Sequence, residues 1–485
     1  MSQRRRPLQV HKVGGSCLGS AERLNQVVAV IAGAQAHADV VLVLSALPGV
    51  TDRLSALIEA SPLSEPQIVE ELGTLRAPHQ ALAAELLADP HLRLQVEEAQ
   101  WALLASVERL LVGASYTGEV TPRLTDLVLC HGERLAVPLL VGLLRQHGIP
   151  AVATPPERIG LRTDGVFGNA TVDAGETLSS VGAVLFPHLV EEHLPVVEGF
   201  YGIDGAGEVT TFGRGGSDYS AAVLAAVLGA DELVIWKDVE GFLSADPTLV
   251  PHARLVPQLS YREAAELSYF GAKILHPRTV EPLAPTGVPL RIRPLADPSA
   301  AGTTVGQSPH SDGSAARPVV CAVASDAHIG VLKLHGVGVG ARPGVLGELT
   351  ALVGDAGYNI RSVVTAQTCI ALLLEAADLQ PVARLVRARV GPPIERIELL
   401  PDRALVAIVG EGVLQTPGVA AGAFSAIAAE GINVELVSAG ASEVAYYLVV
   451  SRSDLPSTVG AIHRWVLGGS VPPGAANRLV SPIPQ

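Results

Sequence analysis

The stretch TTFGRGGSDYSAAVLAAVLGADELVIWKDVEG, residues 210–241, decides the fold class. A glycine-rich loop is followed by an alanine-rich segment of helical length, an apolar run and an acidic turn. An apolar run without alternating polar residues is typical of a strand that is buried on both faces of a parallel sheet. The stretch therefore predicts a loop, a helix and a parallel strand in succession.

The N-terminal part of the chain repeats this alternation of predicted helices and strands. Apolar strands alternate with amphipathic segments, whereas residues 65–112 have apolar residues at helical spacing without strands between them. The predicted strands are 8–13, 40–44, 149–153 and 195–199, and the first predicted helix is 21–36. Such alternation predicts an α/β fold, an αβα sandwich with a mostly parallel sheet, from which residues 65–112 form a helical excursion.

The C-terminal part has a different pattern. Residues 294–317 are rich in Pro, Ser, Gly and Ala, which is typical of a linker or a long surface connection. Beyond them PGVLGELTALVGDAGYNI (343–360) is echoed by PGVAAGAFSAIAAEGINV (417–434), each within the order strand, loop, helix, strand, strand. Two copies predict a tandem α/β module, because a solenoid needs more repeats.

Composition excludes several classes of function. The 485 residues carry a formal net charge of −14, which disfavours nucleic acid and anionic membranes as partners. No apolar run reaches the roughly 18 residues of a membrane span, and no signal peptide follows Arg4–Arg6. The four cysteines are far apart, which disfavours a disulfide framework or a metal site. We expect a chain without a resident metal in a reducing cytoplasm.

Lysine is scarce in this chain. Of 34 basic residues only four are lysines, namely Lys12, Lys237, Lys273 and Lys333. Lysine differs from arginine in offering a compact, flexible point charge, so these positions are candidates for a role that arginine would not fill.

Two glycine-rich turns are candidate ligand sites. KVGGSC (12–17) ends an apolar strand with a lysine and two glycines, although such turns also occur as ordinary strand-to-helix corners. FGRGGSD (212–218) lets backbone N–H groups approach a ligand at the start of a helix, where Arg214 suits a carboxylate and Asp218 a lysine or a metal ion. A surface turn with an Asp-capped helix is the alternative for this second stretch.

Two charged residues stand in apolar surroundings. Glu133 in CHGERLAV suits an ammonium group, or is simply an acidic residue at a helix start. Lys273 in ELSYFGAKILHPR needs an anionic partner if it is buried, unless its stem lies along apolar surface with the ammonium group in water. GVGVGARPG (336–344) lacks the G-x-G-x-x-G spacing of a dinucleotide fingerprint, so this stretch is not predicted to bind a dinucleotide.

Taken together these motifs resemble the aspartate kinases over essentially the whole chain. The resemblance rests on KVGGS, VLSALPGVTD, HGERLA, RTDGVFGNA, FGRGGSDYSAAVLA, IWKDVEGFLSADP and SYREAAELSYFGAKILHPRTVEPL, in this order. The sequence of these motifs is most similar to the kinase part of bifunctional aspartokinase–homoserine dehydrogenases. We expect a monofunctional chain, because it ends near residue 485. The tandem module is similar to paired ferredoxin-like ACT domains.

The resemblance implies a domain order. An amino-acid kinase catalytic domain would occupy 1–300, and a linker with a joining strand 301–327. ACT domains would follow at 328–400 and 401–470, before a tail at 471–485. In this family a segment near 319–324 joins the second ACT unit, so that the first is nested within it.

The implied reaction transfers a phosphoryl group from ATP to the β-carboxylate of L-aspartate, with Mg²⁺. That carboxylate is already ionised, so no general base is required, and catalysis consists of alignment and charge neutralisation. By resemblance Lys12 contacts the phosphoryl group and Asp218 holds the lysines. The nucleotide contacts implied are Lys12, Gly14, Gly15, Ser16, Gly215, Gly216, Lys237, Asp238, Leu243 and Lys273, and the aspartate contacts are Ser45, Thr51, Glu133, Arg214 and Ser217.

The chain departs from the family pattern at the nucleotide turn. KFGGTS is usual where KVGGSC stands here, and this change keeps the hydroxyl at Ser16. The family commonly has threonine at the position of Lys237, tyrosine at that of Leu243 and arginine at that of Thr248. Our hypothesis is that Lys237 replaces the missing arginine by reaching a phosphate.

The ACT pair implies a homodimer that is controlled by an end-product amino acid. The candidate effector contacts are Asn359, Ile360, Gln367 and Thr368. Lysine-inhibited relatives have acids where Val363 and Cys369 stand, so lysine is disfavoured as the sole inhibitor.

Two alternatives stay open. The first is another amino-acid kinase, for glutamate or N-acetylglutamate, but such a kinase would lack the ACT pair and the FGAKILHPR motif. A catalytically inactive amino-acid sensor would fit the altered nucleotide turn, because a protein can keep the fold of an enzyme family after losing its activity.

Overall fold

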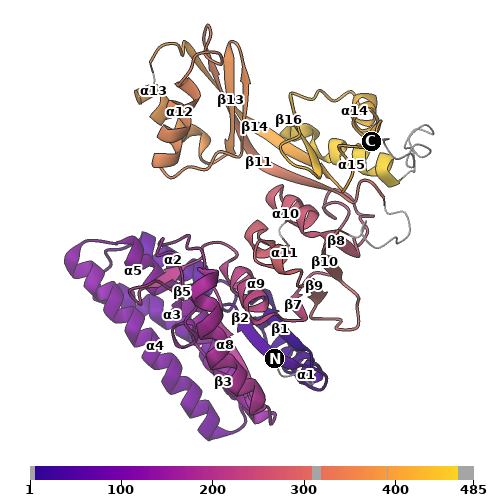
Figure 1. Ribbon diagram of the computed structural model, residues 1–485. Helices are drawn as coiled ribbons and strands as arrows, with labels where there is room; N and C mark the ends of the chain where they lie inside the picture. Colours follow the sequence, from indigo (N-terminus) through magenta and orange to yellow (C-terminus); the bar gives the residue numbers. More distant parts are fainter. Residues whose placement is uncertain (1–5, 273, 309–317, 390, 468–485) are drawn as a thin grey trace. The chain divides into compact units, whose positions relative to one another are not determined.

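The computed structural model describes residues 6–272, 274–308, 318–389 and 391–467, which form two compact units (Figure 1). The first unit contains the described residues up to 242, together with 257–265 and 274–308. The second unit contains 243–256, 266–272 and the described residues from 318 onwards.

The first unit is built on a mixed, mostly parallel sheet in the order β3-β4-β2-β1-β7-β9-β10-β8. Its strands are β1 (Leu8–Val13), β2 (Asp39–Leu44), β3 (Ala151–Ala153), β4 (Leu194–Glu198), β7 (Glu232–Lys237), β8 (Gln258–Ser260), β9 (Leu290–Pro294) and β10 (Thr303–Gly306). Every neighbouring pair is parallel except β9 with β10. Because β1 lies at the centre, Lys12 is in register with Val43 on one side and Ile235 on the other.

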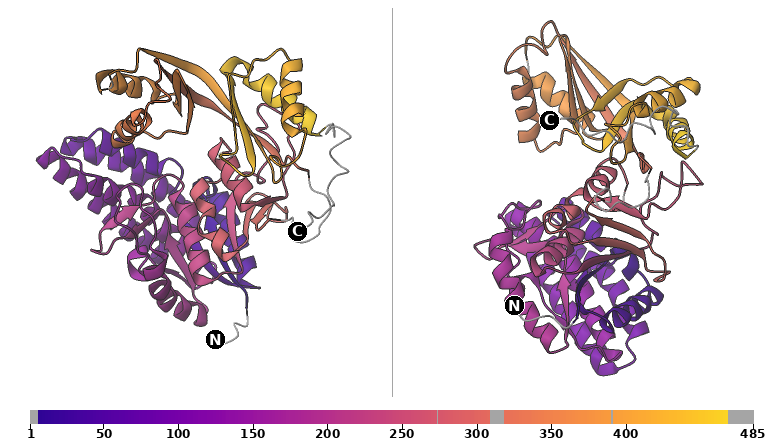
Figure 2. Two further views of the ribbon diagram at one scale, coloured as in Figure 1. Left: turned by 45° about the horizontal axis from the view of Figure 1, so that its top comes forward. Right: turned by 45° about the vertical axis from the view of Figure 1, so that its right-hand side comes forward.

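Helices cover both faces of this sheet (Figure 2). The helices that contact its strands are α1 (Ala21–Gln35), α6 (His131–Gln146), α8 (Ala174–Val190) and α9 (Gly216–Leu228). The other elements in this part of the chain are α2 (Val50–Glu59), α3 (Glu65–Leu86), α4 (Pro90–Thr117), α5 (Pro122–Leu129), α7 (Pro156–Ile159), α11 (Leu283–Thr286), the 3-10 turns η1 (Gly15–Leu18) and η2 (Pro277–Val280), and a hairpin of β5 (Tyr201–Ile203) and β6 (Val209–Thr211). Helix α10 (Tyr261–Tyr269) begins in the first unit, and its residues from 266 onwards belong to the second. Leu42 and Leu44 of β2 pack with α1 and α6, whereas Val43, which is also buried, points to the opposite face as strand alternation requires. The predicted αβα sandwich is confirmed.

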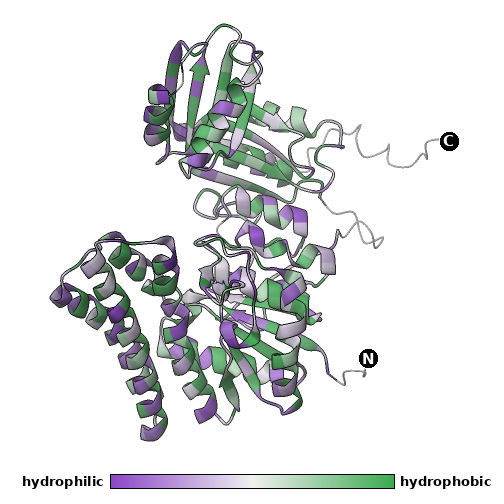
Figure 3. Ribbon diagram, turned by 60° about the vertical axis from the view of Figure 1, so that its left-hand side comes forward, coloured by the Kyte–Doolittle hydropathy of each residue, from purple (hydrophilic) through white to green (hydrophobic). Residues whose placement is uncertain are grey.

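The helical excursion predicted at 65–112 is also confirmed. It consists of α3 and α4, which contact each other and α6, and Asp89 caps α4 by accepting a hydrogen bond from the backbone N–H of His91. Figure 3 shows the strands as mostly hydrophobic, whereas the long helix α4 carries both hydrophilic and hydrophobic residues, as an amphipathic helix does.

One sequence expectation needs correction. Residues Pro122–Gln146, which include α5 and α6, are by length and composition apolar enough to cross a membrane, contrary to the expectation that no stretch of the chain is. Of the apolar window 78% is buried inside the fold, which is the normal situation of a core helix. Burial against the sheet and α4 explains this apolar composition.

The second unit contains an antiparallel sheet in the order β12-β13-β11-β14-β16-β15. Its elements are β11 (Ala322–His335), α12 (Val345–Asp355), β12 (Ser362–Ala366), β13 (Cys369–Glu375), α13 (Leu379–Arg389), β14 (Arg396–Val409), α14 (Val419–Ala429), β15 (Leu436–Ala439), β16 (Ala445–Ser451), η4 (Arg452–Asp454) and α15 (Leu455–Leu467). The two ferredoxin-like halves predicted from the repeat are confirmed, because α12 and α14 occupy equivalent places between a long strand and a hairpin.

The long strand β11 belongs to both halves of this sheet. Its residues Ala322–Asp326 pair with the end of β14, and after an irregularity residues 329–335 pair with the beginning of β14 and with β13. The chain thus enters the half built by the second repeat before it forms the first repeat.

Part of the predicted linker is a strand. Within 301–327, β10 (Thr303–Gly306) pairs with β9 and β8 in the first sheet, because Thr303, Thr304 and Val305 are β-branched and suit a strand. Residues 309–317 and the predicted tail at 471–485 lie outside the described residues. The domain boundaries themselves stay predictions.

Two segments from the first 300 residues belong to the second unit. Val250 joins an apolar core with Val323 and Ala404, and the hydroxyl of Ser244 lies 2.8 Å from Nε2 of His463. The ring of Phe270 lies 5.2 Å from that of Tyr447, and Tyr269 donates a hydrogen bond to the carbonyl of Arg361. The chain therefore passes between the two units more often than a single boundary near residue 300 predicts.

Candidate active site

A cavity of about 590 Å³ opens at the carboxyl ends of the parallel strands in the first unit. This edge is where α/β sheets generally bind ligands. The predicted site residues that line it are Lys12, Gly15, Ser16, Ser45, Thr51, Glu133, Arg214, Gly215, Gly216, Ser217 and Asp218. Residues from distant parts of the chain thus meet in one cavity, and their roles stay predictions.

The turn after β1 requires two glycines because backbone passes close by on both sides. The N–H of Gly14 donates to the carbonyl of Trp236, which ties the turn to the end of β7. A Cβ at Gly14 would lie 3.3 Å from this carbonyl oxygen, and one at Gly15 only 2.8 Å from the carbonyl oxygen of Ala46. Any larger residue at position 15 would push the turn away from β2.

Helix α9 begins directly at the cavity. Gly215 precedes it with a φ of 75°, in the left-handed region, and a Cβ there would lie 2.2 Å from the side chain of His276. The first turn of α9 presents Gly216, Ser217 and Asp218 to the cavity. The positive end of the helix dipole and its free N–H groups favour an anion at this position.

Two lysines share the carboxylate of Asp218. Nζ of Lys12 lies 2.5 Å from Oδ1 of Asp218, and Nζ of Lys237 lies 3.1 Å from Oδ2. The Lys12 side chain is on the face of β1 that carries Val10 and contacts α9, which brings the lysine to Asp218. One carboxylate therefore leaves a surplus positive charge beside the glycine turn.

The ionisation of this trio follows from burial and from the charges together. Burial opposes ionisation of Asp218, but Lys12 and Lys237 outweigh it and hold the pKa of Asp218 at about 2. Burial lowers the pKa of Lys12, and the nearby Lys237 adds to this effect, while Asp218 opposes it. A phosphate beside the two lysines would stabilise their charged forms.

Glu133 forms a second charged group at the cavity. It lies in the first turn of α6 and is only 3% exposed, and Ser217 donates a hydrogen bond of 2.9 Å to its Oε1. Burial raises the pKa of Glu133 to about 7 although this hydrogen bond favours the ionised form. Its other oxygen, Oε2, is buried and has no hydrogen-bond partner among the described residues, so it can accept a hydrogen bond from a ligand.

Three further predicted aspartate contacts line the same cavity. Arg214 is exposed and makes no hydrogen bond or ion pair with the residues that the structure describes, so its guanidinium group is available to a carboxylate. Ser45 follows β2 directly, and Thr51 lies at the start of α2. The cavity thus offers a carboxylate and a guanidinium group, which suits a zwitterionic amino acid.

The remaining predicted residues are not all brought to the cavity. Asp238 is exposed and accepts a hydrogen bond of 3.0 Å from the hydroxyl of Ser16. Leu243 belongs to the second unit, where it pairs with Leu255. Lys273 lies outside the described residues.

The four predicted effector residues do not form one cluster within a chain. Asn359 and Ile360 precede β12, whereas Gln367 and Thr368 form the turn after it. Five residues of extended strand separate the two pairs by roughly 16 Å, which is too far for one amino acid to contact both. A single chain therefore does not assemble the predicted effector site.

Two further residues were not predicted from the sequence: Asp126, which lines the cavity, and Arg278, which binds backbone next to the lining residues Gly168 and Gly213. Asp126 is fully buried and accepts hydrogen bonds of 2.8 Å from the backbone N–H groups of Gly168 and Thr211 and from the Thr211 hydroxyl. Arg278 donates hydrogen bonds to the carbonyls of Ala170 and Phe212 and lies over the ring of Tyr219. The only sequence signal was the position of Asp126 two helical turns before Glu133.

A buried polar cluster lies behind the cavity residue Phe200. Tyr201 donates to Glu198 and lies within hydrogen-bond distance of Glu157, while Arg134 donates to the Tyr201 hydroxyl. Burial raises the pKa of Glu198 to about 7. This part of the protein therefore contains a second carboxyl group that titrates near neutral pH.

Comparisons with known proteins agree with this arrangement. The amino acid kinase family matches residues 7–294, and an ACT domain matches residues 406–465. Aspartokinase 3, chloroplastic, of Arabidopsis thaliana is 30% identical over 94% of this chain and 80% of its own length. Bifunctional aspartokinase/homoserine dehydrogenase 1 of the same plant is 28% identical over 94% of this chain, which spans about half of that relative.

A solved bacterial structure is similar over nearly the whole chain. E. coli aspartokinase III in complex with aspartate and ADP superposes with a TM-score of 0.80 at 29% identity, over 95% of this chain and all of that one. The same enzyme in complex with lysine and aspartate gives 0.77 over 94% of this chain and 98% of that one. Given the matching family, the relatives and the shared architecture, this chain belongs to the aspartokinase group of the amino acid kinase family.

Proposed function

We propose that this chain is an aspartate kinase, which phosphorylates the β-carboxylate of L-aspartate with ATP to give 4-phospho-L-aspartate and ADP. The observation that carries this proposal is that Lys12 and Lys237 share the carboxylate of Asp218 beside a glycine turn. Lys12 and Asp218 line a cavity that is also lined by Glu133 and Arg214. Relatives of known structure bind aspartate and ADP, which supports the same ligands here. The product would be the first intermediate of aspartate-family amino-acid biosynthesis.

The proposed reaction needs no proton transfer from a general base, because the β-carboxylate is already ionised. A β-carboxylate oxygen attacks the γ-phosphorus, the bond from this phosphorus to the bridging oxygen breaks, and ADP leaves. Lys12, Lys237 and the N–H groups at the start of α9 supply the positive charge that two approaching anions need. Glu133 would take the substrate ammonium group, and Arg214 its α-carboxylate.

The cavity suits Mg²⁺ that arrives with the nucleotide. Asp218 is engaged by two lysines and Asp126 by three hydrogen bonds, so neither is free to bind a cation. Mg²⁺ is commonly bound through substrate phosphates, where it neutralises charge on the transferred group. No dedicated metal ligands are therefore assigned here.

The proposal is tested by the formation of aspartyl hydroxamate with ATP, Mg²⁺ and hydroxylamine. We expect product with L-aspartate and none with L-glutamate or N-acetyl-L-glutamate. If product forms only with L-glutamate or only with N-acetyl-L-glutamate, the chain is an amino-acid kinase for that substrate. If no substrate gives product although aspartate binds, the chain is an inactive amino-acid sensor.

We expect replacement of Lys237 by alanine to raise the KM for ATP about tenfold, as loss of a hydrogen bond to a charged group does. Lys237 lies 3.1 Å from Asp218, on the same carboxylate as Lys12, and this supports a contact with a phosphate rather than with the adenine base. Steady-state kinetics with varied ATP at saturating aspartate measures the effect. The KM for aspartate should stay unchanged.

The matched variant is Lys237→Thr, which introduces the residue common in the family. If Lys237 contacts a phosphate, threonine should lose affinity for ATP as alanine does, since it cannot extend a charge. An unchanged KM for ATP in the alanine variant would refute this role.

We infer that the second unit makes the enzyme feedback-regulated, with an amino acid as effector and a homodimer as the active form. Its support is the ACT domain match at 406–465 and the complex of E. coli aspartokinase III with lysine. Val363 and Cys369 carry no charge that could hold a lysine ammonium group, so lysine alone is not the expected inhibitor. Because Asn359 and Gln367 lie at opposite ends of β12, we propose that an effector is enclosed by contributions from two chains.

The edge strands β12 and β15 support such an assembly, since within the described ranges neither pairs with a strand on its outer side, where another chain could pair. Light scattering coupled to size exclusion measures the oligomer, and inhibition assays with lysine and threonine identify the effector. The four free cysteines suit a reducing compartment, which we propose to be the cytoplasm, although the plant relatives are chloroplastic.

A further inference from the structure

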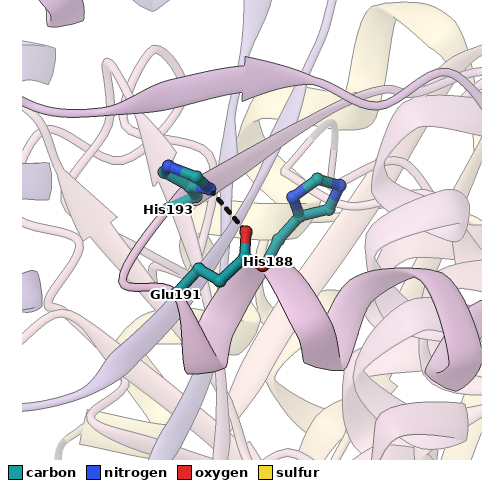
Figure 4. Close-up of side chains that lie close together, drawn as sticks. All are labelled: His188, Glu191 and His193. Atoms are coloured by element: carbon teal, nitrogen blue, oxygen red, sulfur yellow. Dashed lines mark ion pairs between the residues drawn. The ribbon is translucent and has the colours of Figure 1, made fainter.

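Three side chains that bind metals converge where α8 meets β4. His188 lies in the last turn of α8, Glu191 ends this helix, and His193 directly precedes β4 (Figure 4). Their candidate ligand atoms all lie within 4.8 Å of one another, and among the described residues these three form the only such group of histidine, cysteine and acidic side chains. The backbone achieves this by a left-handed residue, Glu192 with a φ of 58°, which turns the chain so that the N–H of His193 donates to the carbonyl of His188.

One ring nitrogen of each histidine is buried without a hydrogen bond. Among the described residues, neither Nδ1 of His188 nor Nδ1 of His193 has a hydrogen-bond partner. Nδ1 of His193 lies 3.3 Å from Oε2 of Glu191, yet the geometry is not that of a hydrogen bond. Two imidazole nitrogens and a carboxylate oxygen within 4.8 Å of one another can offer three lone pairs to one cation.

We propose that His188, Glu191 and His193 bind one divalent transition-metal ion, with Zn²⁺ as the best fit. Two imidazole nitrogens and one carboxylate are typical zinc ligands, whereas Mg²⁺ and Ca²⁺ prefer oxygen ligands alone. Bonds of about 2.0–2.1 Å in a tetrahedral site place ligand atoms about 3.4 Å apart, so small rotations of the side chains would close the site. Glu191, whose side chain is 65% exposed, is free to make this adjustment, and water would fill the fourth position.

The position of this group assigns it a structural role. His193 lies at the amino end of β4, whereas the cavity lies at the carboxyl ends of the parallel strands. Five residues of β4 separate the two by roughly 16 Å. The ion would fasten the end of α8 to the start of β4, so its effect would be on stability rather than on phosphoryl transfer.

The test is calorimetric titration of the full chain with Zn²⁺ after chelator treatment, in the absence of nucleotide. We expect one ion per chain, a rise of the thermal midpoint with Zn²⁺, and at least about tenfold weaker binding in His188→Ala and in His193→Ala. His147→Ala is the matched control, because His147 is an exposed histidine that also follows a helix, α6, and it should bind as the wild type does. Binding of Co²⁺, followed by its visible absorption, gives a second readout of nitrogen and oxygen ligation.

Glu191→Gln keeps the test valid if a histidine variant fails to fold, because this exposed side chain can be changed without disturbing the core. It should weaken binding as well. Absence of a bound ion in the wild type would overturn the proposal and leave an ion pair between protonated His193 and Glu191. Equal affinity in wild type and in these variants would also overturn it.

Discussion

Replacement of Lys12 by methionine should lower kcat for aspartyl phosphate formation by about 10³, the usual effect of losing a main electrostatic contact to a developing charge. Lys12 is 4% exposed, and its ammonium group lies at the cavity beside the glycine turn. Methionine is unbranched and only one atom shorter than lysine, and Asp218 retains Lys237 as its counter-charge. The fold should therefore persist while the positive charge at the phosphoryl group is lost.

The control for this experiment is Lys333→Met, the same chemical change in β11 of the second unit. It should leave kcat unaltered. Single-turnover measurements with both variants separate the chemical step from product release. A Lys12→Met enzyme with wild-type kcat would show that this lysine does not touch the transferred group.

Replacement of Glu133 by glutamine should raise the KM for L-aspartate about a hundredfold, with a smaller change in kcat. The variant removes the negative charge that would hold the substrate ammonium group, which costs about 3 kcal/mol for a buried, charged partner. The interaction is equally strong in the ground and transition states, so its loss appears mainly in KM. Glutamine has the same shape and can still accept the hydrogen bond from Ser217, so folding should be unaffected.

The same residue should determine the pH dependence of aspartate binding. Burial raises the pKa of Glu133 to about 7, so the carboxyl group is protonated below this pH and ionised above it. Only the ionised form can pair with an ammonium group, and kcat/KM for aspartate should therefore fall about tenfold for each pH unit below 7 and be level above it. Glu133→Gln should remove this dependence.

Glu198 provides a check on that assignment, because burial raises its pKa to about 7 as well and it remains in the Glu133→Gln variant. If the variant keeps the wild-type pH profile, the titration belongs to Glu198 or another group. The ammonium group of aspartate would then have a different partner.

The strands of the first sheet could be predicted because burial on both faces leaves continuous apolar runs, as in Val40–Leu44. The candidate site could be predicted because its motifs follow a family pattern. The resemblance implied that Asp218 holds lysines. That Lys237 is one of them could not be predicted, since it depends on β7 lying beside β1 and on α9 contacting both. Asp126 was missed because its partners are 42 and 85 residues further along the chain and have no local signature.

The segments 243–256 and 266–272 have a consequence for how this enzyme can be divided. The described chain changes unit at 243, 257 and 266, and again between 272 and 274 and between 308 and 318, so no single cut separates one unit from the other. A protein ending at residue 300 would keep Val250 and Phe270 but lose the core and the aromatic partner against which they pack. The proposed catalytic and regulatory units are therefore built from interleaved segments of one chain. Deletion of the C-terminal half should yield an unstable protein rather than an unregulated kinase.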